Sequence, residues 1–541
     1  MLRRRNGSRV QFAWTRQGIH DIQIGLADER FAAPGTPVRS NTTWLLVRNV
    51  SHLAIGQVAS TGLGLLLTIV IGRAFEPAQL GILYIVGTIC SFAYVIVDWG
   101  QSSYLLREIA RGRIDEPELI GSALAIRLIA IVFSSAAAAA IALVLGYNGE
   151  VVVLTLLAMT VGIPAVLFGA FDCCFRGKDR MDLDAFAINV GKAITLVATA
   201  IALRFSVGLT QVILTQGVGN IATLVVGLIA ARRLVISVKA PAMNALRELL
   251  RCGAPIVAFS LVLAVQPFLD VLLLSAFAGS AVVGWYGASR SIYGVVSSPV
   301  TILIGASFPQ LSRASRSLPD FRRMIDATGR VMFIVGAFTC SVLYVFADDA
   351  VAIIYGLGRF EQTASILRVT AIFIPLMCFV LVLASAMTAV GRNKAMAVIT
   401  VARVAFCVIL NWLFIGYWQQ RFGNGAVALV IISGVAEIPA TIAFLTLLPK
   451  GAVGSTTTLN FVRACVASVC TVVPLSMLQP LGLLYLTPLF VLLFAVAAMI
   501  TRLVLLSDIR LAMEVARSGV LATQAAKTAS KASGGDRGGI G

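Results

Sequence analysis

Apolar stretches as long as a bilayer is thick constrain this chain more than any other feature. About 20 apolar residues are needed to cross a ~30 Å hydrocarbon core as a helix. Only 13% of the 541 residues are charged, whereas 58% are hydrophobic. Since backbone polar groups in lipid must be satisfied within the segment, the stretches are expected to be helical. The sequence therefore predicts an all-α polytopic membrane protein with fourteen transmembrane helices, near residues 52–73, 80–100, 119–146, 151–171, 185–206, 209–231, 253–278, 281–305, 331–355, 364–389, 395–416, 425–448, 460–479 and 482–504.

The distribution of basic residues predicts the orientation of the chain. Lys and Arg accumulate in cytoplasmic loops, and most of the 43 here fall in alternate loops that face the cytoplasm if both termini are cytoplasmic. The net charge of +18 is therefore mainly a topology signal, together with attraction to anionic lipid head groups. No basic segment is interleaved with stacking aromatics, so nucleic-acid binding is not expected.

Two sequence patterns indicate an internal repeat. Leu80-Gly81 to Tyr84, at the start of the second span, resembles Val283-Gly284 to Tyr286, at the start of the eighth. Six spans per copy would give two six-helix lobes related as parallel repeats, followed by two C-terminal helices. The expected divisions are a disordered basic extension (1–47), an N-lobe (48–233), a cytoplasmic linker (234–252), a C-lobe (253–448), spans 13 and 14 (449–505) and a cytoplasmic tail (506–541).

Four basic side chains interrupt the apolar spans: Arg127, Lys192, Arg290 and Arg403. A charge at the centre of a span costs roughly 2.5 to 3.5 kcal/mol on insertion scales. Any one of them alone is explained equally well by snorkelling or by a structural ion pair. Together they favour a cationic cavity that receives an anion.

Three acidic side chains, Asp98, Asp270 and Glu437, also lie within spans. By depth, Asp270 can pair with Arg290 and Glu437 with Arg403. Alternatively, Asp270 or Glu437 couples transport to an ion gradient by binding H⁺ or Na⁺.

The sequence shows no motif typical of a catalytic site or a metal site. The nine cysteines suggest no disulfide framework, and with two histidines no metal site or cofactor is expected. Gly191-Lys192 lacks the rest of a phosphate-binding loop. The pair Asp348-Asp349 has no base or metal ligand nearby in the sequence. The chain is therefore not expected to be an enzyme.

A series of motifs in the first half resembles the polysaccharide exporters. The stretch 72–81 is similar to their A-R-x-L-G-P-x-x-aromatic-G loop, but departs from it at Gly72, Phe75, Glu76 and Leu80. The residues that match this loop and the D-x-G and R-E-hydrophobic-A-R motifs after it are Arg73, Pro77, Gly81, Asp98, Gly100, Arg107 and Glu108.

The second half continues the resemblance in order. A run similar to the exporters' P…D…LLS…GxYxAA…P-x-LS contains Pro255, Asp270, Gly284, Tyr286, Arg290 and Pro309. The likeness covers roughly residues 45–450. The chain thus resembles the O-antigen flippase family of polysaccharide exporters, in the multidrug/oligosaccharidyl-lipid/polysaccharide (MOP) superfamily.

This resemblance implies a gradient-driven flippase of the bacterial inner membrane. Its substrate would be an undecaprenyl-diphosphate-linked oligosaccharide, the repeat unit of an O-antigen or exopolysaccharide, moved from the inner to the outer leaflet by alternating access. Membrane lipids and the polysaccharide polymerase machinery would be its partners. Arginine binds a diphosphate bidentately and lysine as a point charge. The candidate contacts are Arg48, Arg127, Lys192, Arg290 and Arg403.

Four other functions make different demands on the sequence. A peptidoglycan-precursor (lipid II) flippase also has fourteen spans and a basic cavity. A multidrug/cation antiporter of the same superfamily usually has twelve spans, and cationic drugs do not suit a basic cavity. A membrane polymerase or glycosyltransferase normally needs a large external loop, which the predicted topology lacks. A membrane scaffold would have a dry interior.

Overall fold

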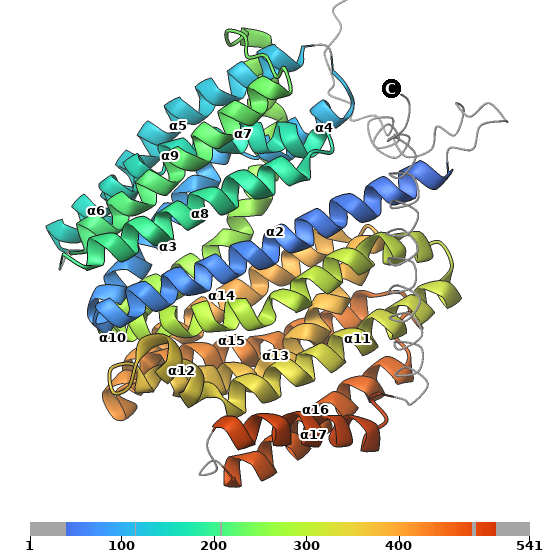
Figure 1. Cartoon of the computed structure of the whole chain (residues 1–541). Coiled ribbons are helices and arrows are strands. Elements are labelled where there is room, and N and C mark those ends of the chain that lie inside the picture. Colours follow the sequence, from blue (N-terminus) through green and yellow to red (C-terminus); the bar gives the residue numbers. More distant parts are fainter. Residues whose placement is uncertain (1–38, 114, 206–207, 479–482, 505–541) are drawn as a thin grey trace, which may run out of the picture. The chain divides into compact units, whose positions relative to one another are not determined.

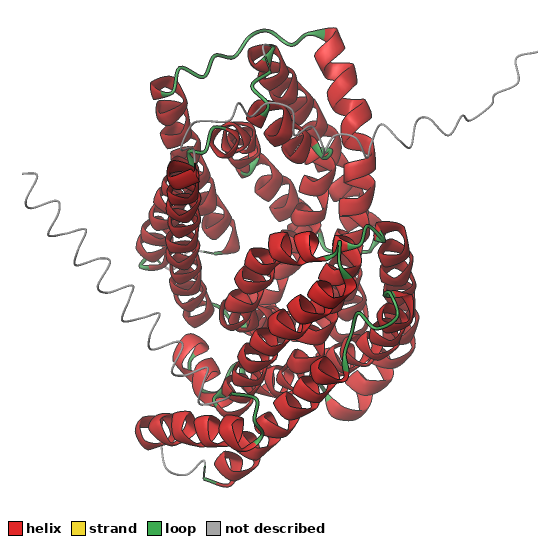
Figure 2. Cartoon of the chain, turned by 90° about the vertical axis from the view of Figure 1, so that its right-hand side faces the viewer, coloured by secondary structure: helices red, strands yellow, loops and turns green. Residues whose placement is uncertain are grey.

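The computed structural model describes residues 39–113, 115–205, 208–478 and 483–504. Within these ranges the regular structure is helical, and Figure 2 draws no strand. The helices are α2 (Arg39–Ala74), α3 (Pro77–Asp98), α4 (Gln101–Ala110), α5 (Glu116–Val144), α6 (Gly149–Val161), α7 (Ile163–Gly177), α8 (Met181–Leu203), α9 (Leu209–Arg233), α10 (Met243–Ala314), α11 (Leu318–Val345), α12 (Ala347–Tyr355), α13 (Glu361–Ala389), α14 (Asn393–Phe422), α15 (Gly425–Leu447), α16 (Ser455–Met477) and α17 (Leu483–Ile500).

Twelve helical segments of the described residues are long and apolar enough to cross a membrane. One of them is α10, whose 72 residues cover the seventh and eighth predicted spans, and the apolar α17 matches the fourteenth. The predicted fold class of an all-α polytopic membrane protein is therefore confirmed. The short helix α4 was not predicted, and the predicted span 331–355 is divided between α11, which begins thirteen residues earlier, and α12.

Helix α10 is a hairpin whose two halves meet without a loop. Its backbone is helical except at Gly279, where φ is 82° and ψ is 172°. L-residues rarely adopt a positive φ of this kind, and glycine does so without a steric penalty. The first half runs antiparallel to α3, because Gly253 contacts Trp99 and Phe268 stacks on Phe92. The second half runs parallel to α3, because Gly284 contacts Pro77 and Gly287 contacts Tyr84, so the chain reverses at Gly279.

Two glycine contacts hold α3 against α10, and we name them after Gly81 in α3 and Gly100 just beyond its end. At the Gly81 crossing, a Cβ on Gly81 would lie 1.8 Å from the Ser280 carbonyl oxygen. Reciprocally, a Cβ on Gly284 would lie 1.9 Å from the Pro77 carbonyl oxygen. Each glycine thus meets the carbonyl four residues before the other one. The two glycines of the repeated sequence pattern form a symmetric point of contact between the backbones.

The Gly100 crossing lies at the opposite end of α3. Gly100 has a φ of 71° and begins α4, and a Cβ on Gly253 would lie 2.2 Å from the Trp99 carbonyl oxygen. The indole Nε1 of Trp99 donates a hydrogen bond to the Leu250 carbonyl oxygen at 3.1 Å. Helix α3 is therefore in backbone contact with α10 at both ends.

A charged cluster fastens the start of α10 to the segment after α4. Arg113 donates to both carboxylate oxygens of Glu248, at 2.5 and 2.8 Å, and the Tyr104 hydroxyl donates to the same carboxylate. Burial, followed by this hydrogen bond, raises the pKa of Tyr104 above its usual value. The hydrogen bonds with Glu248 and Asp115 raise the pKa of Arg113. Tyr104 is therefore neutral and Arg113 is charged at neutral pH.

The largest hydrophobic core is formed by the second half of α10 with α11, α13, α15 and α16. A second core combines α3, α5, α6 and α9 with the first half of α10, and it includes Ile366 and Leu429 from the second predicted lobe. Helices α16 and α17 lie side by side, and α16 packs on α11 (Figure 1). The predicted cytoplasmic tail and residues 1–38 of the predicted extension lie outside the described residues.

Candidate functional site

Arg127 on α5 is part of a buried ion pair. Its Nη2 lies 2.8 Å from an Asp98 carboxylate oxygen and 2.9 Å from the Ser102 hydroxyl. Its Nη1 donates to the Val166 carbonyl oxygen at 2.8 Å, and the whole residue is only 2% exposed. The predicted partner of Arg127 was an anionic substrate, whereas its partners in the structure are groups of the protein itself. Arg127 directs its outer nitrogens to protein groups and neutralises Asp98.

Lys192 on α8 points toward α2. Its ammonium lies 2.5 Å from the Ser60 hydroxyl and 3.4 Å from the Ser60 carbonyl oxygen. No described carboxylate lies within salt-bridge distance of it. A cavity of about 200 Å³ beside it is lined by Leu63, Gly64, Leu67, Lys192, Thr195, Gln216 and Asn220.

Arg290, on the second half of α10, lies among three tyrosines. Its guanidinium carbon is 5.4 Å from the centre of the Tyr293 ring. Tyr84 is close enough to interact with the guanidinium electrostatically, and Tyr286 packs edge-on against Tyr84 with ring centres 6.1 Å apart. Part of the Arg290 surface is left uncovered by other protein atoms, and no described carboxylate lies within salt-bridge distance of it. A guanidinium that lies over one aromatic ring and has no carboxylate partner can bind an anion bidentately.

A buried polar cluster on α10, α14 and α15 contains the other two spanning acids. Arg403 Nη1 lies 2.8 Å from Glu437 Oε1, which is the pairing expected from their depths. Asp270 is 5% exposed and accepts a hydrogen bond from Asn411 Nδ2 at 3.1 Å. Arg290 and Arg403 both act on Asp270 electrostatically, but neither lies within salt-bridge distance of it. Glu437 Oε2 is buried without a hydrogen-bond partner in the described residues.

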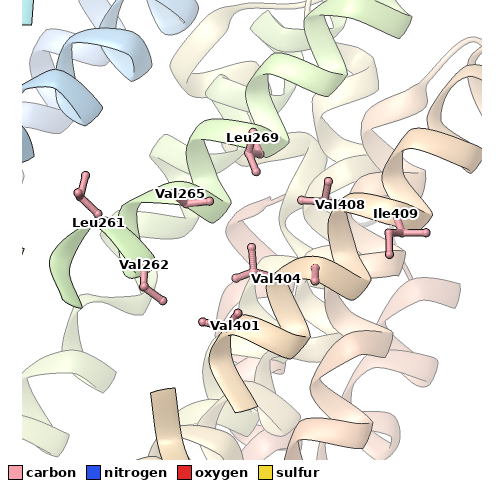
Figure 3. A pocket seen from close by; sticks show the side chains of 9 residues that line it. Leu261, Val262, Val265, Leu269, Val401, Val404, Val408 and Ile409 are labelled. Atoms are coloured by element: carbon pink, nitrogen blue, oxygen red, sulfur yellow. The ribbon is translucent and has the colours of Figure 1, made fainter. Parts of the chain in front are cut away.

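An apolar cavity of about 470 Å³ lies next to this cluster, between the first half of α10 and α14 (Figure 3). Its lining is Leu261, Val262, Val265, Leu269, Val401, Val404, Ala405, Val408 and Ile409. Leu269 directly precedes Asp270, and Val404 directly follows Arg403. Charged and apolar surfaces therefore adjoin along both helices.

The motif residues have mainly structural places. Arg73 donates to the Ile353 carbonyl oxygen at 2.6 Å, and Pro77 begins α3. Arg107 lies 3.0 Å from Glu108, whereas Pro255 and Pro309 lie inside α10. The side chain of Arg48 lies outside the described residues.

The sequence analysis missed the neutral partners of the charged groups. Tyr293, Asn411, Ser60 and Ser102 contact the spanning charges and were not singled out, and Tyr84 was named only for its place in the repeated pattern. Two signals were available. Asn411 is a polar residue inside an apolar span, and Tyr293 follows Arg290 by three residues on one helix face.

Comparison with known proteins relates this fold to one sequence family and to several solved transporter structures. The sequence model of the polysaccharide biosynthesis protein family matches residues 46–315. No curated protein sequence matches the chain. Among solved structures, a lipid II flippase MurJ in an inward closed conformation has a TM-score of 0.66 at 14% identity, covering 83% of this chain and 98% of that one.

Two further structures share the fold. A multidrug resistance MATE family transporter of the MOP superfamily, in an inward-facing conformation, has a TM-score of 0.59 at 16% identity, covering 77% of this chain and 98% of that one. A MOP superfamily transporter from Pyrococcus furiosus, described as having a binding pocket of reverse polarity, has a TM-score of 0.54 at 17% identity, covering 78% and 96%. With these matches, the chain belongs to the polysaccharide biosynthesis protein family and has the fold of the MOP superfamily.

Proposed function

We propose that this protein moves an undecaprenyl-diphosphate-linked oligosaccharide, an O-antigen or exopolysaccharide repeat unit, from the inner to the outer leaflet of a bacterial inner membrane. The observation that carries the proposal is Arg290, a guanidinium inside an apolar helix that has no described carboxylate within salt-bridge distance. A diphosphate has the negative charge and the paired oxygens that the two parallel N–H donors of a guanidinium bind. The family match, to polysaccharide biosynthesis proteins, supports a glycan substrate.

Two features of the helices support alternating access. Helix α3 touches α10 through glycines at both of its ends, so the backbones of the two helices are in direct contact there. Helix α2 has mostly half-exposed side chains between Gly56 and Val70, which leaves it loosely packed along its length. Movement of the lobes about α3 would then open the substrate site at Arg290 to one leaflet at a time.

Lipid II flipping is the second candidate, because the structural match to the lipid II flippase is extensive. Both lipids carry a diphosphate, so Arg290 serves either one. Reconstituting the protein in liposomes with an undecaprenyl-diphosphate disaccharide in one set and lipid II in another separates the two. We expect flipping of the first lipid at a rate well above that of protein-free liposomes and of the lipid II set.

Replacing Arg290 with Gln is expected to lower the flipping rate by roughly tenfold or more, since a hydrogen bond to a charged group contributes about 1.5–3 kcal/mol. The initial rate in proteoliposomes is the measurement. Arg290→Lys should retain part of the rate because it keeps the charge but loses the bidentate fork. Arg316→Gln, at an exposed arginine just after α10, is the matched control. A wild-type rate in Arg290→Gln would remove the site from the mechanism.

Ion coupling is expected to depend on Asp270. Its carboxylate is buried, touches Asn411 and is only electrostatically compensated by arginines, so binding of H⁺ or Na⁺ would relieve its charge. We expect Asp270→Asn to abolish the acceleration of flipping by an imposed H⁺ or Na⁺ gradient. Asp348→Asn, at an exposed residue paired with Arg368, should keep that acceleration. Equal acceleration in Asp270→Asn and wild type would exclude Asp270 as the carrier.

A further inference from the structure

The cavity beside Lys192 has a mixed polar and apolar lining. Three helices form it: α2 contributes Leu63, Gly64 and Leu67, α8 contributes Lys192 and Thr195, and α9 contributes Gln216 and Asn220. It holds one cation and two carboxamides, and no acidic residue lines it. Its volume of about 200 Å³ lies below the roughly 300–1,000 Å³ of sites that enclose a whole small molecule. It therefore suits a single charged group.

Lys192 differs from two of the other bases in how its charge is compensated. Arg127 and Arg403 each lie 2.8 Å from a carboxylate oxygen. Lys192 has only the two oxygens of Ser60 as hydrogen-bond acceptors among the described residues. An ammonium has three donor hydrogens. One donor and a whole positive charge are therefore left for a ligand.

Those same contacts tie α2 to α8. Besides the Lys192 contacts with Ser60, Asn189 Nδ2 donates to the Gly56 carbonyl oxygen at 3.1 Å. A Cβ on Gly56 would lie 2.6 Å from the Ala185 side chain, so the helices are in close contact there. An anion that takes the ammonium as its partner competes with the neutral Ser60 oxygens. The anion adds a Coulomb attraction to the ammonium that the uncharged Ser60 oxygens lack.

We propose that this cavity is a second anion subsite, separate from Arg290, which takes one carboxylate or phosphate group of the substrate and thereby loosens α2 from α8. The inference rests on the proposed function for the identity of the substrate, but the site itself does not. A lysine suits one compact anionic group, whereas the fork of Arg290 suits the diphosphate. The anion reaches the subsite either as an acidic sugar of the glycan or as a phosphate of the lipid carrier.

The first test measures binding without transport. Sodium glucuronate and inorganic phosphate, each compared with glucose, are added to the detergent-purified full chain during thermal unfolding. A ligand that binds only the folded protein raises the melting temperature. We expect a rise with at least one anion in the wild type and in Lys192→Arg, and none in Lys192→Gln. Equal melting temperatures with the anions and with glucose in the wild type would overturn the subsite.

The second test identifies the source of the anion. Flipping of an undecaprenyl-diphosphate disaccharide ending in glucuronate is compared with that of one ending in glucose. If the sugar supplies the anion, Lys192→Gln lowers the glucuronate-to-glucose rate ratio by roughly tenfold, the worth of one charge-assisted hydrogen bond. If the carrier phosphate supplies it, both rates fall by about that factor and Lys192→Arg restores both. Equal losses in Lys192→Gln and Lys192→Arg would mean that the lysine is only a structural tether.

Two controls separate the possible failures. Lys178→Gln, at a lysine paired with Glu116 outside the cavity, should leave the rate ratio and the anion-induced rise unchanged. Ser60→Ala removes the hydroxyl contact with α2 but leaves the ammonium, so it should strengthen anion binding if Ser60 competes for Lys192. Weaker anion binding in Ser60→Ala would overturn the competition. If the wild type flips neither lipid, the proposed function fails, and the melting experiment still decides the subsite.

Discussion

Replacing Asp98 with Ala is expected to destabilise the protein by about 3 kcal/mol, because it leaves the guanidinium of Arg127 buried without its counter-charge. Removing one partner of a buried ion pair typically costs 3–5 kcal/mol. We expect the low end, since the Asp98 side chain is 35% exposed and water can partly replace it. The measurement is the melting temperature in detergent, with folding checked by size-exclusion chromatography.

The matched variants distinguish charge from packing. The double variant Asp98→Ala/Arg127→Leu carries neither charge and should recover most of the lost stability, because the desolvation cost of the arginine disappears with it. Asp115→Ala, at a more exposed carboxylate paired with Arg113, should cost less than 1 kcal/mol, as surface ion pairs usually do. A wild-type melting temperature in Asp98→Ala would show that Arg127 is not dependent on this partner.

Replacing Gly284 with Val is expected to lower flipping by roughly a hundredfold. A Cβ there would lie 1.9 Å from the Pro77 carbonyl oxygen, so α3 and α10 must separate at the Gly81 crossing. Overpacking a tight contact costs typically 1–3 kcal/mol. A cost of about 3 kcal/mol would lower the population of the closed arrangement, in which α3 and α10 touch at the Gly81 crossing, by roughly a hundredfold. The readouts are the flipping rate and the labelling of a Ser289→Cys variant by a charged thiol reagent, since Ser289 is 2% exposed in the closed arrangement.

A control glycine lies on the same helix. Gly294 has no atom within 4 Å of the position that a Cβ would occupy, so Gly294→Val should preserve both flipping and the protection of Ser289. Gly81→Ala tests the reciprocal side of the same crossing, where the obstacle is the Ser280 carbonyl oxygen. Similar flipping rates in the Gly284 and Gly294 variants would show that closure at this crossing is not part of the transport cycle.

The helices could be predicted because the length of an apolar stretch is a local property of the sequence. Even the break inside α10 fell between two predicted spans, at Gly279. Depth within the membrane is also local, and it brought Arg403 and Glu437 to one level, where they form an ion pair. The fold class and this pair therefore followed from the sequence.

Partners that depend on helix rotation could not be predicted in the same way. Arg127 and Asp98 lie on different helices, and only the packing of α5 against α3 turns their side chains toward each other. Depth suggested Arg290 as the partner of Asp270, but the carboxylate instead accepts a hydrogen bond from Asn411. Likewise, the sequence placed Lys192 in a shared cationic cavity, whereas the ammonium contacts Ser60 on α2.

The pairing of Arg127 with Asp98 also bears on how the chain enters the membrane during synthesis. Helix α3 leaves the ribosome before α5, so Asp98 is already at the bilayer when Arg127 arrives. An arginine in the middle of a segment adds roughly 2.5–3.5 kcal/mol to the cost of insertion. If α3 remains beside the insertion channel, its carboxylate offsets that cost before α5 reaches lipid. The ion pair therefore favours release of α3, α4 and α5 into the bilayer as one unit rather than helix by helix.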